Sequence, residues 1–403
     1  MSFANIFSRR RILGLAAFAT AICCAFSTGE VLGVMSTPMI YRKDFIQLYL
    51  MGHALRAGVS LYAPMAELAA GIDPYLGEWL KVSAYPPVAA LIGLPISYLS
   101  YFWAAVVWLF LEICSLFTAV FLAVKRFGGQ TGRTPVLVTA CFFIGWDTIY
   151  VEITLGQLMI PILLLLTLTW LALRAGKDLQ AGLLLGVVMA LKLYAWPLAI
   201  FLFLAGRRRA VFAAVAVVVA ANVAMVGVVG TSVVVDYYSR VGEAVLAQYV
   251  SDPWNFSAWS IGYRAAGTVG AIGLSAGMLG YSLLLALRTK DFESGFMTML
   301  IASVVLQPIS WIHYLVTLLP AFCFVANRQH FTRGEYAFAM FLIALILQGR
   351  YPDNGPHPVL LATWPPFLFI VGLLWLTART RASSPPQHVG FNEKAELDVL
   401  SGA

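Results

Sequence analysis

Residues 101–124 read YFWAAVVWLFLEICSLFTAVFLAV, and Glu112 is the only charged side chain among them. A helix needs about 20 residues to cross the hydrocarbon of a membrane, so this run predicts a transmembrane span. The whole chain has a similar character, since 61% of its 403 residues are hydrophobic and only 11% are charged. A soluble domain carries about one quarter charged residues. The composition therefore predicts an integral membrane protein.

Similar apolar runs on both sides of this stretch predict an all-α fold, a polytopic transmembrane helical bundle with about 12 spans. The run 85–100 opens with Pro86 and Pro87 and is interrupted by Pro95, so we expect a re-entrant helix there. The pair 181–195 and 197–206 is short and predicts two half-buried helices or a broken hairpin. The expected spans are 12–34, 101–124, 134–155, 157–174, 181–195, 197–206, 210–231, 265–287, 293–310, 312–327, 335–350 and 358–377.

The basic residues orient these spans. Eighteen of the 26 Lys and Arg residues fall on the side of the N-terminus and seven on the other side. Cytoplasmic loops carry the excess of Lys and Arg, which predicts a cytoplasmic (inner) membrane protein with both termini inside. The outer loops would be 35–84 and 232–264. Residues 1–380 are expected to form one membrane domain, and 381–403 a disordered cytoplasmic tail.

The sequence predicts neither a metal site nor a cofactor. Its five cysteines all lie in expected spans, without a CxxC spacing. It contains no Gly-rich phosphate loop, no HExxH motif and no nucleotide-binding signature. The net charge of +7 is explained by the orientation of the spans, so it does not indicate a nucleic-acid partner.

Asp44 is the most prominent candidate in the first outer loop. Arg42 and Lys43 precede it, and residues 44–57 predict an amphipathic helix on the membrane surface that stops at Gly58. Asp is favoured as an N-cap because it accepts hydrogen bonds from the first free N–H groups of a helix. Asp44 also lies where a lipid-linked substrate would present its head group, so a functional role stays open beside the capping role.

The second outer loop combines aromatic and polar residues. Residues 252–259 read DPWNFSAW, and Arg264 follows. Rings can pack against the apolar faces of a sugar while groups such as Asn255 bind its hydroxyls. The same composition is also typical of an aromatic belt at the membrane interface, so the sequence leaves both interpretations open.

Ionisable groups at membrane depth form the third feature. His313, two residues after Trp311, lies at the start of one expected span, and Lys192 lies inside another. Such groups are costly in a membrane and are often functional. His313 could instead be an interfacial residue, and Lys192 could extend to the surface along its own stem. Gln157, at the outer end of a span, could line the same cavity.

These features occur in a recognisable order. The pieces are Asp44-Phe45 with Tyr49, Ala54-Leu55, Gly58 and Leu61-Tyr62, then Tyr85-Pro86-Pro87, Gly156-Gln157, Ala181-Gly182 through Gly186 to Lys192, Arg207-Arg208-Arg209, and Ser310-Trp311-Ile312-His313-Tyr314. In order and spacing the set resembles glycosyltransferase family 87, of the GT-C superfamily. The family is similar to the polyprenyl-phosphate-mannose-dependent α-mannosyltransferases.

The resemblance implies a multi-span enzyme that moves a hexose, mannose by analogy, from a polyprenyl-phosphate donor on the extracytoplasmic face. It also implies an acid in the first outer loop as catalytic base, which maps onto Asp44. The acceptor would be a hydroxyl of a glycolipid or glycan, and a single displacement would invert the anomeric centre. Paired acids are frequent in this superfamily, whereas Asp44 has no adjacent acid, which argues against a metal. The residues expected to bind substrate are Lys192, Arg264 and His313 at the phosphate, with Gln157, Tyr85, Asn255 and Trp311.

A transporter or flippase of a lipid-linked sugar is the alternative. It would share the span count and the intramembrane Lys192. Transporters commonly contain two related halves with broken helices in matching positions. The sequence has one broken region, near 195–197, without a counterpart in its second half, which favours the enzyme.

Overall fold

The computed structural model describes residues 44–70, 72, 83–127, 147–289, 291–327, 332, 334–335, 337–339, 341–342 and 359–379. Within these ranges all regular structure is helical, which confirms the all-α prediction. The expected span 12–34 and the tail 381–403 lie outside them, as do most of 134–155 and 335–350.

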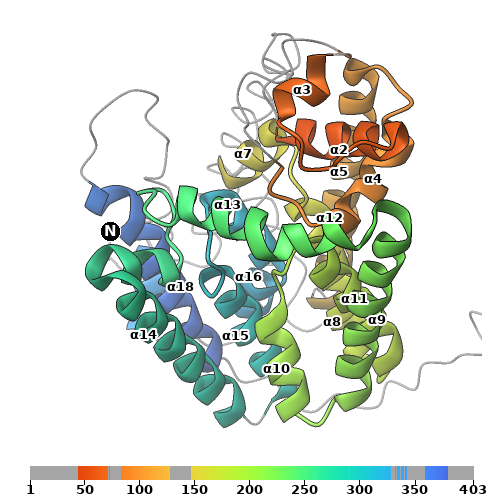
Figure 1. Ribbon diagram of the computed structural model, residues 1–403. Coiled ribbons are helices and arrows are strands. Elements are labelled where there is room, and N and C mark those ends of the chain that lie inside the picture. The colour runs from red at the N-terminus through yellow and green to blue at the C-terminus, as the bar shows by residue number, and fades with distance from the viewer. Residues whose placement is uncertain are drawn as a thin grey trace, which may run out of the picture.

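The helices follow one another in this order: α2 Phe45–Ala57, α3 Met65–Ala70, the 3-10 helix η4 Pro87–Ala89, α4 Ala90–Ile96, α5 Tyr101–Phe127, α7 Asp147–Leu155, α8 Met159–Arg174, α9 Asp178–Leu191, α10 Trp196–Leu204, α11 Arg208–Val229, α12 Thr231–Asp236, the π-helical η5 Tyr237–Val241, α13 Gly242–Tyr249, α14 Ala258–Arg288, α15 Phe292–Val305, the 3-10 helix η6 Ile312–Leu318, α16 Leu319–Ala326 and α18 Val359–Arg379. In Figure 1, α12 and α13 run across the view, with α10, α14 and α15 below them and α2, α3 and α4 above.

Three of the described helices, α5, α11 and α14, are long and apolar enough to cross a membrane. The pair α7 and α8 adds a fourth if it counts as one span, although the two helices are bent by 116°. The α5, α11 and α14 helices expose large apolar side chains such as Phe110, Val223 and Val269, as lipid-facing helices do. About 12 spans are not confirmed, because several of the expected runs form helices of 9–16 residues.

One of these shorter helices, α15, is a core element. In α15 every residue from Glu293 to Val305 is buried, and a helix that is apolar on all sides belongs inside a protein or a membrane. The expected break between 181–195 and 197–206 is present, since α9 ends at Leu191 and α10 begins at Trp196. The run 85–100 forms η4 and α4, which together span only Pro87–Ile96, in agreement with a helix too short to cross.

The α2 helix has the expected extent, and Gly58 ends it in the left-handed conformation (φ 68°). It does not have the amphipathic, exposed character that the sequence predicted, because nine of its thirteen residues are buried by the protein. The physical reason is close packing against α4. A Cβ at Gly93 would lie 1.9 Å from the Leu48 carbonyl oxygen, and one at Gly52 would lie 2.2 Å from the Gly93 backbone. Glycines at both positions let the two helices touch along their backbones.

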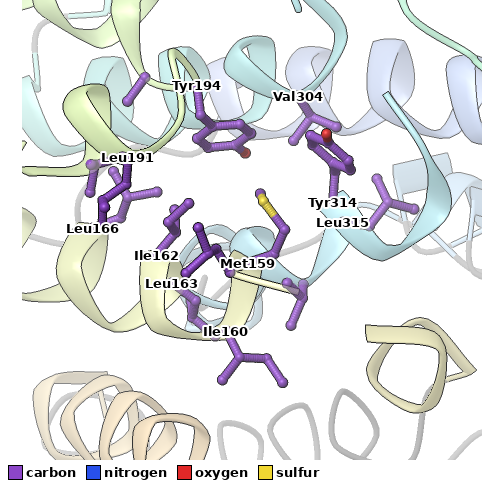
Figure 2. Packing of buried hydrophobic residues seen from close by; sticks show 14 of the residues in the cluster. Met159, Ile160, Ile162, Leu163, Leu166, Leu191, Tyr194, Val304, Tyr314 and Leu315 are labelled. Carbon is purple, nitrogen blue, oxygen red and sulfur yellow. The ribbon is translucent and has the colours of Figure 1, made fainter. Parts of the chain in front are cut away.

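A hydrophobic cluster lies around the first turns of α8. Side chains of α8, of the α9–α10 connection and of η6 meet there, including Tyr194 and Tyr314 (Figure 2). The Tyr194 and Thr317 hydroxyls form a short hydrogen bond inside this cluster. The labelled members in Figure 2 are Met159, Ile160, Ile162, Leu163, Leu166, Leu191, Tyr194, Val304, Tyr314 and Leu315. The cluster fixes the loops that carry the polar residues described below.

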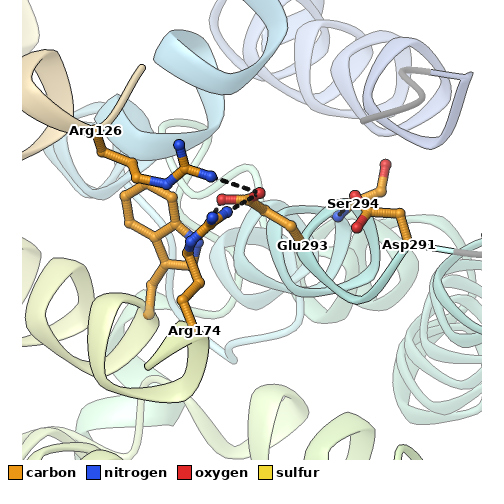
Figure 3. A network of polar contacts seen from close by, with 6 residues as sticks. Arg126, Arg174, Asp291, Glu293 and Ser294 are labelled. Atoms are coloured by element: carbon orange, nitrogen blue, oxygen red, sulfur yellow. Dashed lines mark hydrogen bonds and ion pairs between the residues drawn. The ribbon is translucent and has the colours of Figure 1, made fainter. Parts of the chain in front are cut away.

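Basic side chains gather where α5 and α8 end and α15 begins. Glu293 forms ion pairs with Arg174 and, at 3.6 Å, with Arg126, and it accepts a hydrogen bond from Trp170 Nε1 at 3.0 Å (Figure 3). The Arg207 guanidinium lies 5.0 Å from the ring of Phe292, which precedes Glu293. We call this the basic end of the bundle. Its arginines were all predicted to be cytoplasmic.

Candidate active site

Asp44 directly precedes α2, but its side chain does not cap the helix. Its backbone is already helical (φ −63°, ψ −17°), and its carboxylate makes no hydrogen bond to the first N–H groups of α2. Instead, Oδ2 accepts a hydrogen bond of 2.6 Å from Gln157 Nε2. The capping role that the sequence left open is therefore not the one the side chain adopts.

Gln157 joins Asp44 to two further side chains. Its Oε1 atom accepts hydrogen bonds from Lys192 Nζ at 3.3 Å and from the Tyr85 hydroxyl at 3.5 Å. An acid, an amide and a cation from three distant parts of the chain thus form one connected path. Four of the predicted site residues, Asp44, Tyr85, Gln157 and Lys192, meet at this place.

The turn between α7 and α8 positions Gln157. Gly156 has φ 65°, a conformation that glycine adopts at little cost, and its carbonyl accepts a hydrogen bond of 3.0 Å from Trp108 Nε1. The same indole stacks on Phe45, with ring centroids 5.4 Å apart. Trp108 therefore holds the start of α2 beside the turn, which keeps Asp44 within reach of Gln157.

Lys192 follows the last residue of α9 in an extended conformation. Its Nζ atom lies 4.1 Å from the ring centroid of Tyr314 and 6.0 Å from that of Tyr85, distances suited to cation–π interaction. The ammonium group is thus held by Gln157 and two aromatic faces of the protein. This arrangement differs from that of a lysine that merely extends along its stem to the surface.

Glu152 is a member of the site whose role sequence reasoning missed. It is fully buried in α7, and its Oε1 atom accepts hydrogen bonds from the Met159 N–H at 2.6 Å and the Ile160 N–H at 3.3 Å. Its charge also interacts with Lys192 and with Asp44. One sequence signal was available, since α8 starts directly after a Gly turn and without a Ser, Thr, Asp or Asn N-cap, so its free N–H groups need another acceptor.

Burial dominates the electrostatics of Asp44. Loss of solvent raises the pKa of its carboxyl above the ordinary value of 3.8, against the opposing effects of the Gln157 hydrogen bond and the Lys192 charge. A carboxylate with a raised pKa is a stronger proton acceptor. The environment of Asp44 is therefore suited to a general base.

His313 lies at the edge of this cluster, near the start of η6. It is buried, and neither ring nitrogen has a hydrogen-bond partner in the described part of the chain. Its ring centroid is 4.9 Å from that of Tyr314, the residue that also faces Lys192, and 5.7 Å from that of Trp311. Buried polar groups normally have partners, so His313 has free capacity for a substrate group.

Asn255 has a different place. Its Nδ2 donates to the carbonyls of Tyr249 (3.1 Å) and Pro308 (3.0 Å), and its Oδ1 accepts from the N–H groups of Ser257 (3.1 Å) and Ser310 (2.9 Å). Both the nitrogen and the oxygen of the Asn255 amide are therefore bonded to the backbone of the protein. Asn255 thus ties the loop before α14 to the segment before η6, and the structure does not join it to Asp44.

Arg264 likewise serves the second loop. Its Nη1 donates to the carbonyls of Asp252 (2.7 Å) and Asn255 (3.1 Å) and to the Ser260 hydroxyl (2.6 Å). These bonds hold the 252–255 turn against the first turns of α14. The structure therefore does not bring Arg264 into the cluster of Asp44, Gln157 and Lys192.

Two aromatic residues connect the two loops that were predicted to be outer. The rings of Tyr62 and Tyr237 stack with centroids 5.5 Å apart, and the Tyr237 hydroxyl donates to the Ala84 carbonyl at 3.3 Å. The Ala84 N–H donates to Gln47 Oε1 at 2.9 Å. Tyr237 begins the π-helical η5, and π-helical turns are frequent at functional sites. In the ranges described, no three His, Cys, Asp or Glu side chains gather as a metal site would need.

Part of this chain matches a known protein family. The sequence profile of glycosyltransferase family 87 matches residues 84–274. The match confirms the predicted resemblance, and the chain is a membrane glycosyltransferase. The alternative of a transporter or flippase is not favoured. The matched range includes Tyr85, Gln157, Lys192, Asn255 and Arg264, whereas Asp44, Trp311 and His313 lie outside it.

The chain is similar to two mycobacterial enzymes, both named polyprenol-phosphate-mannose-dependent alpha-(1-2)-phosphatidylinositol pentamannoside mannosyltransferase. The enzyme of Mycolicibacterium smegmatis is 27% identical over 308 residues, which cover 73% of this chain and 72% of the relative. That of Mycobacterium tuberculosis is 27% identical over 249 residues, covering 59% and 56%. No solved structure shows a significant match. None of these comparisons tests the roles of individual site residues, which stay predictions.

Proposed function

We propose that this glycosyltransferase moves a mannosyl group from a polyprenyl-phosphate donor to a hydroxyl of a glycolipid or glycan. The names of the two relatives support the donor and suggest a phosphatidylinositol mannoside as the first acceptor to test. The donor is a substrate, and no cofactor or metal is part of the proposal. The reaction would take place on the extracytoplasmic face of the cytoplasmic membrane, with both termini inside.

The observation that carries the proposal is the path from Asp44 through Gln157 to Lys192, with bonds of 2.6 and 3.3 Å. It places a proton acceptor and a cation at opposite ends of one amide. A transfer from a sugar phosphate needs those two groups, a base for the attacking hydroxyl and positive charge for the departing phosphate.

The proposed step is a single displacement. The acceptor hydroxyl gives its proton to the Asp44 carboxylate while its oxygen forms a bond to the anomeric carbon. The bond from that carbon to the phosphate oxygen breaks, and its electron pair leaves with the phosphate. Lys192, together with His313, stabilises that charge, and Tyr85 and Trp311 offer aromatic faces to the sugar. Because attack and departure occur on opposite faces, a β-linked donor gives an α-linked product.

Arg264 and Asn255 act differently in this proposal from the sequence-based prediction. Their hydrogen bonds hold the second outer loop, so we propose that they shape the rim of the site without touching the phosphate. Gln157 keeps the role of a substrate-side residue, because its amide lies between the base and the cation.

The test is transfer by purified protein in detergent, without any gradient. Radiolabelled polyprenyl-phosphate mannose is incubated with phosphatidylinositol mannoside acceptors, and the product linkage is determined by NMR. We expect label in the glycolipid with an α linkage. Label that stays on the donor with every mannolipid and glycan acceptor would contradict the transfer, and a product of retained configuration would contradict the single displacement.

A further inference from the structure

A small pocket lies between the C-terminal ends of α14 and α18, far along the chain from the site residues. Its volume is about 180 Å³, and it is lined by Leu285, Arg288, Thr289, Trp375, Ala378 and Arg379. Ser294 follows Glu293 in the first turn of α15. Its hydroxyl donates a hydrogen bond to the Thr377 carbonyl of α18 at 3.2 Å. The pocket thus opens at the basic end of the bundle.

The charge of this pocket is positive. Arg288 and Arg379 are both exposed, and neither forms an ion pair with another part of the chain that the structure describes. The Arg379 guanidinium lies 4.2 Å from the ring centroid of Trp375. The nearby Asp291 directs its carboxylate to the Ser294 N–H at 2.9 Å (Figure 3). In the described part of the chain, no carboxylate therefore forms an ion pair with either of the two arginines that line the pocket.

A cation in the last turn of a helix also interacts favourably with the helix dipole. The helix dipole accounts for an arginine at the end of each helix. It does not account for the pocket between α14 and α18, which Trp375 also lines. Arginine is the side chain best suited to bind a phosphate through several N–H groups. The chemistry of the pocket therefore fits a phosphate monoanion or diester.

The surface that leads to the pocket is apolar. Tyr281, Leu284 and Arg288 are exposed and follow one another at the three- and four-residue spacing of one helix face. An acyl chain could lie along this face of α14 while its head group reaches Arg288. Basic pockets between helices at the cytoplasmic side of a membrane are suited to anionic lipid head groups.

We propose that the pocket between α14 and α18 binds one anionic glycerophospholipid, with its phosphate between Arg288 and Arg379 and an acyl chain along Tyr281 and Leu284. The site is separate from the proposed transfer site and does not depend on that reaction. It anchors the C-terminal helix α18 to α14 through a lipid at the basic end of the bundle.

The test is native mass spectrometry of the full-length protein titrated with phosphatidylglycerol, with phosphatidylcholine and, separately, with inorganic phosphate. We expect the protein to bind one phosphatidylglycerol molecule tightly. The double variant Arg288→Gln with Arg379→Gln should lower the affinity for this lipid about thirtyfold, since each basic residue near an anionic lipid contributes about fivefold. The matched control is Arg208→Gln with Arg209→Gln, which removes the same charge at two exposed positions of the same end, and should change the affinity less than about threefold.

Equal weakening by the two double variants would show a diffuse attraction and overturn the pocket. Phosphatidylcholine that binds as tightly as phosphatidylglycerol would remove the role of the arginines. Inorganic phosphate that displaces the lipid completely would assign the pocket to a free anion and contradict the lipid. A loss confined to the Arg288 and Arg379 variant, with unchanged melting temperature in lipid-free detergent, would support the proposal.

Discussion

At the scale of single residues, Asp44 depends on groups more than a hundred positions away in the sequence. Its carboxylate is held by Gln157, and Lys192 completes the path. Each of the three could be selected from the sequence as a polar residue in an apolar context. Their contact could not, because it requires the turn at Gly156 and the break after α9. Glu152 shows the limit most clearly, since a buried acid acquires its role only from N–H groups on the next helix.

Replacing Asp44 by Asn should separate catalysis from structure. Asn keeps the size and can still accept the Gln157 N–H, but it cannot take a proton. We expect turnover to fall by about 100- to 10,000-fold. Because burial raises the pKa of Asp44, the ionised form costs stability above that pKa, so the melting temperature should be unchanged or higher. Turnover within about threefold of wild type would refute the base role.

The raised pKa of Asp44 also predicts the acid limb of the pH profile. A base acts only when deprotonated, so kcat/KM should fall as the pH drops through the pKa of Asp44, which lies above its ordinary 3.8. The residual activity of Asp44→Asn should lack this limb. The measurement is kcat/KM against pH for both proteins, and a limb that persists in Asp44→Asn would assign it to another group.

Glu152 can be tested by comparing two substitutions. Glu152→Gln keeps an oxygen for the Met159 and Ile160 N–H groups, so stability should change little while the charge facing Lys192 is lost. We expect a higher KM for the donor. Glu152→Ala leaves two buried N–H groups without an acceptor, which costs about 1–3 kcal/mol each, so its melting temperature should drop. Identical melting temperatures for the two variants would contradict the capping role of Glu152.

At the scale of elements, the apolar pattern predicts most helices well and their surroundings poorly. The ends of α5 and α11, and the break between α9 and α10, follow the sequence closely. The burial of α2 does not, because the sequence predicted an amphipathic helix on the membrane surface, whereas nine of its thirteen residues are buried. Periodicity reports which side chains are apolar, whereas the approach of α4 to α2 depends on two glycines in separate segments. The boundary expected between 134–155 and 157–174 is present, where α7 and α8 meet at a bend of 116°.

The contact between α2 and α4 predicts a sharp effect of Gly93→Ala. The added Cβ would lie 1.9 Å from the Leu48 carbonyl oxygen, and backbone cannot move aside as a flexible side chain can. We expect a loss of stability of about 1–3 kcal/mol or more, with reduced activity because α2 carries Asp44 at its start. The control is Gly277→Ala in α14, where nothing lies within 4 Å of a new Cβ. Equal melting temperatures for the two variants would refute the tight packing.

At the scale of the whole molecule, the Asp44 cluster and the basic end of the bundle lie at opposite ends of α8. Gln157 precedes its first turn, and Arg174, in its last turn, pairs with Glu293. This helix is sixteen residues long, which corresponds to about 24 Å at 1.5 Å per residue. The distribution of Lys and Arg in the sequence predicted that basic residues gather on one side of the bundle. In the structure, Arg126 of α5, Arg174 of α8 and Arg207 all lie beside the start of α15. The number of spans could not be predicted as well, since an apolar run can be a core helix or a lipid-facing one.

This division predicts the orientation of the protein in the membrane. Ser239, in η5, and Lys177, before α9, are exposed residues on the proposed outer and inner sides. Each is replaced by cysteine in a background without the five native cysteines, and intact cells are treated with a membrane-impermeant maleimide. We expect Ser239→Cys to be labelled at once and Lys177→Cys only after permeabilisation. Glycosyl transfer by both variants serves as the control for folding. Because positive charge is retained on the cytoplasmic side during insertion, labelling of Lys177→Cys in intact cells would reverse the orientation and place the Asp44 cluster inside the cell.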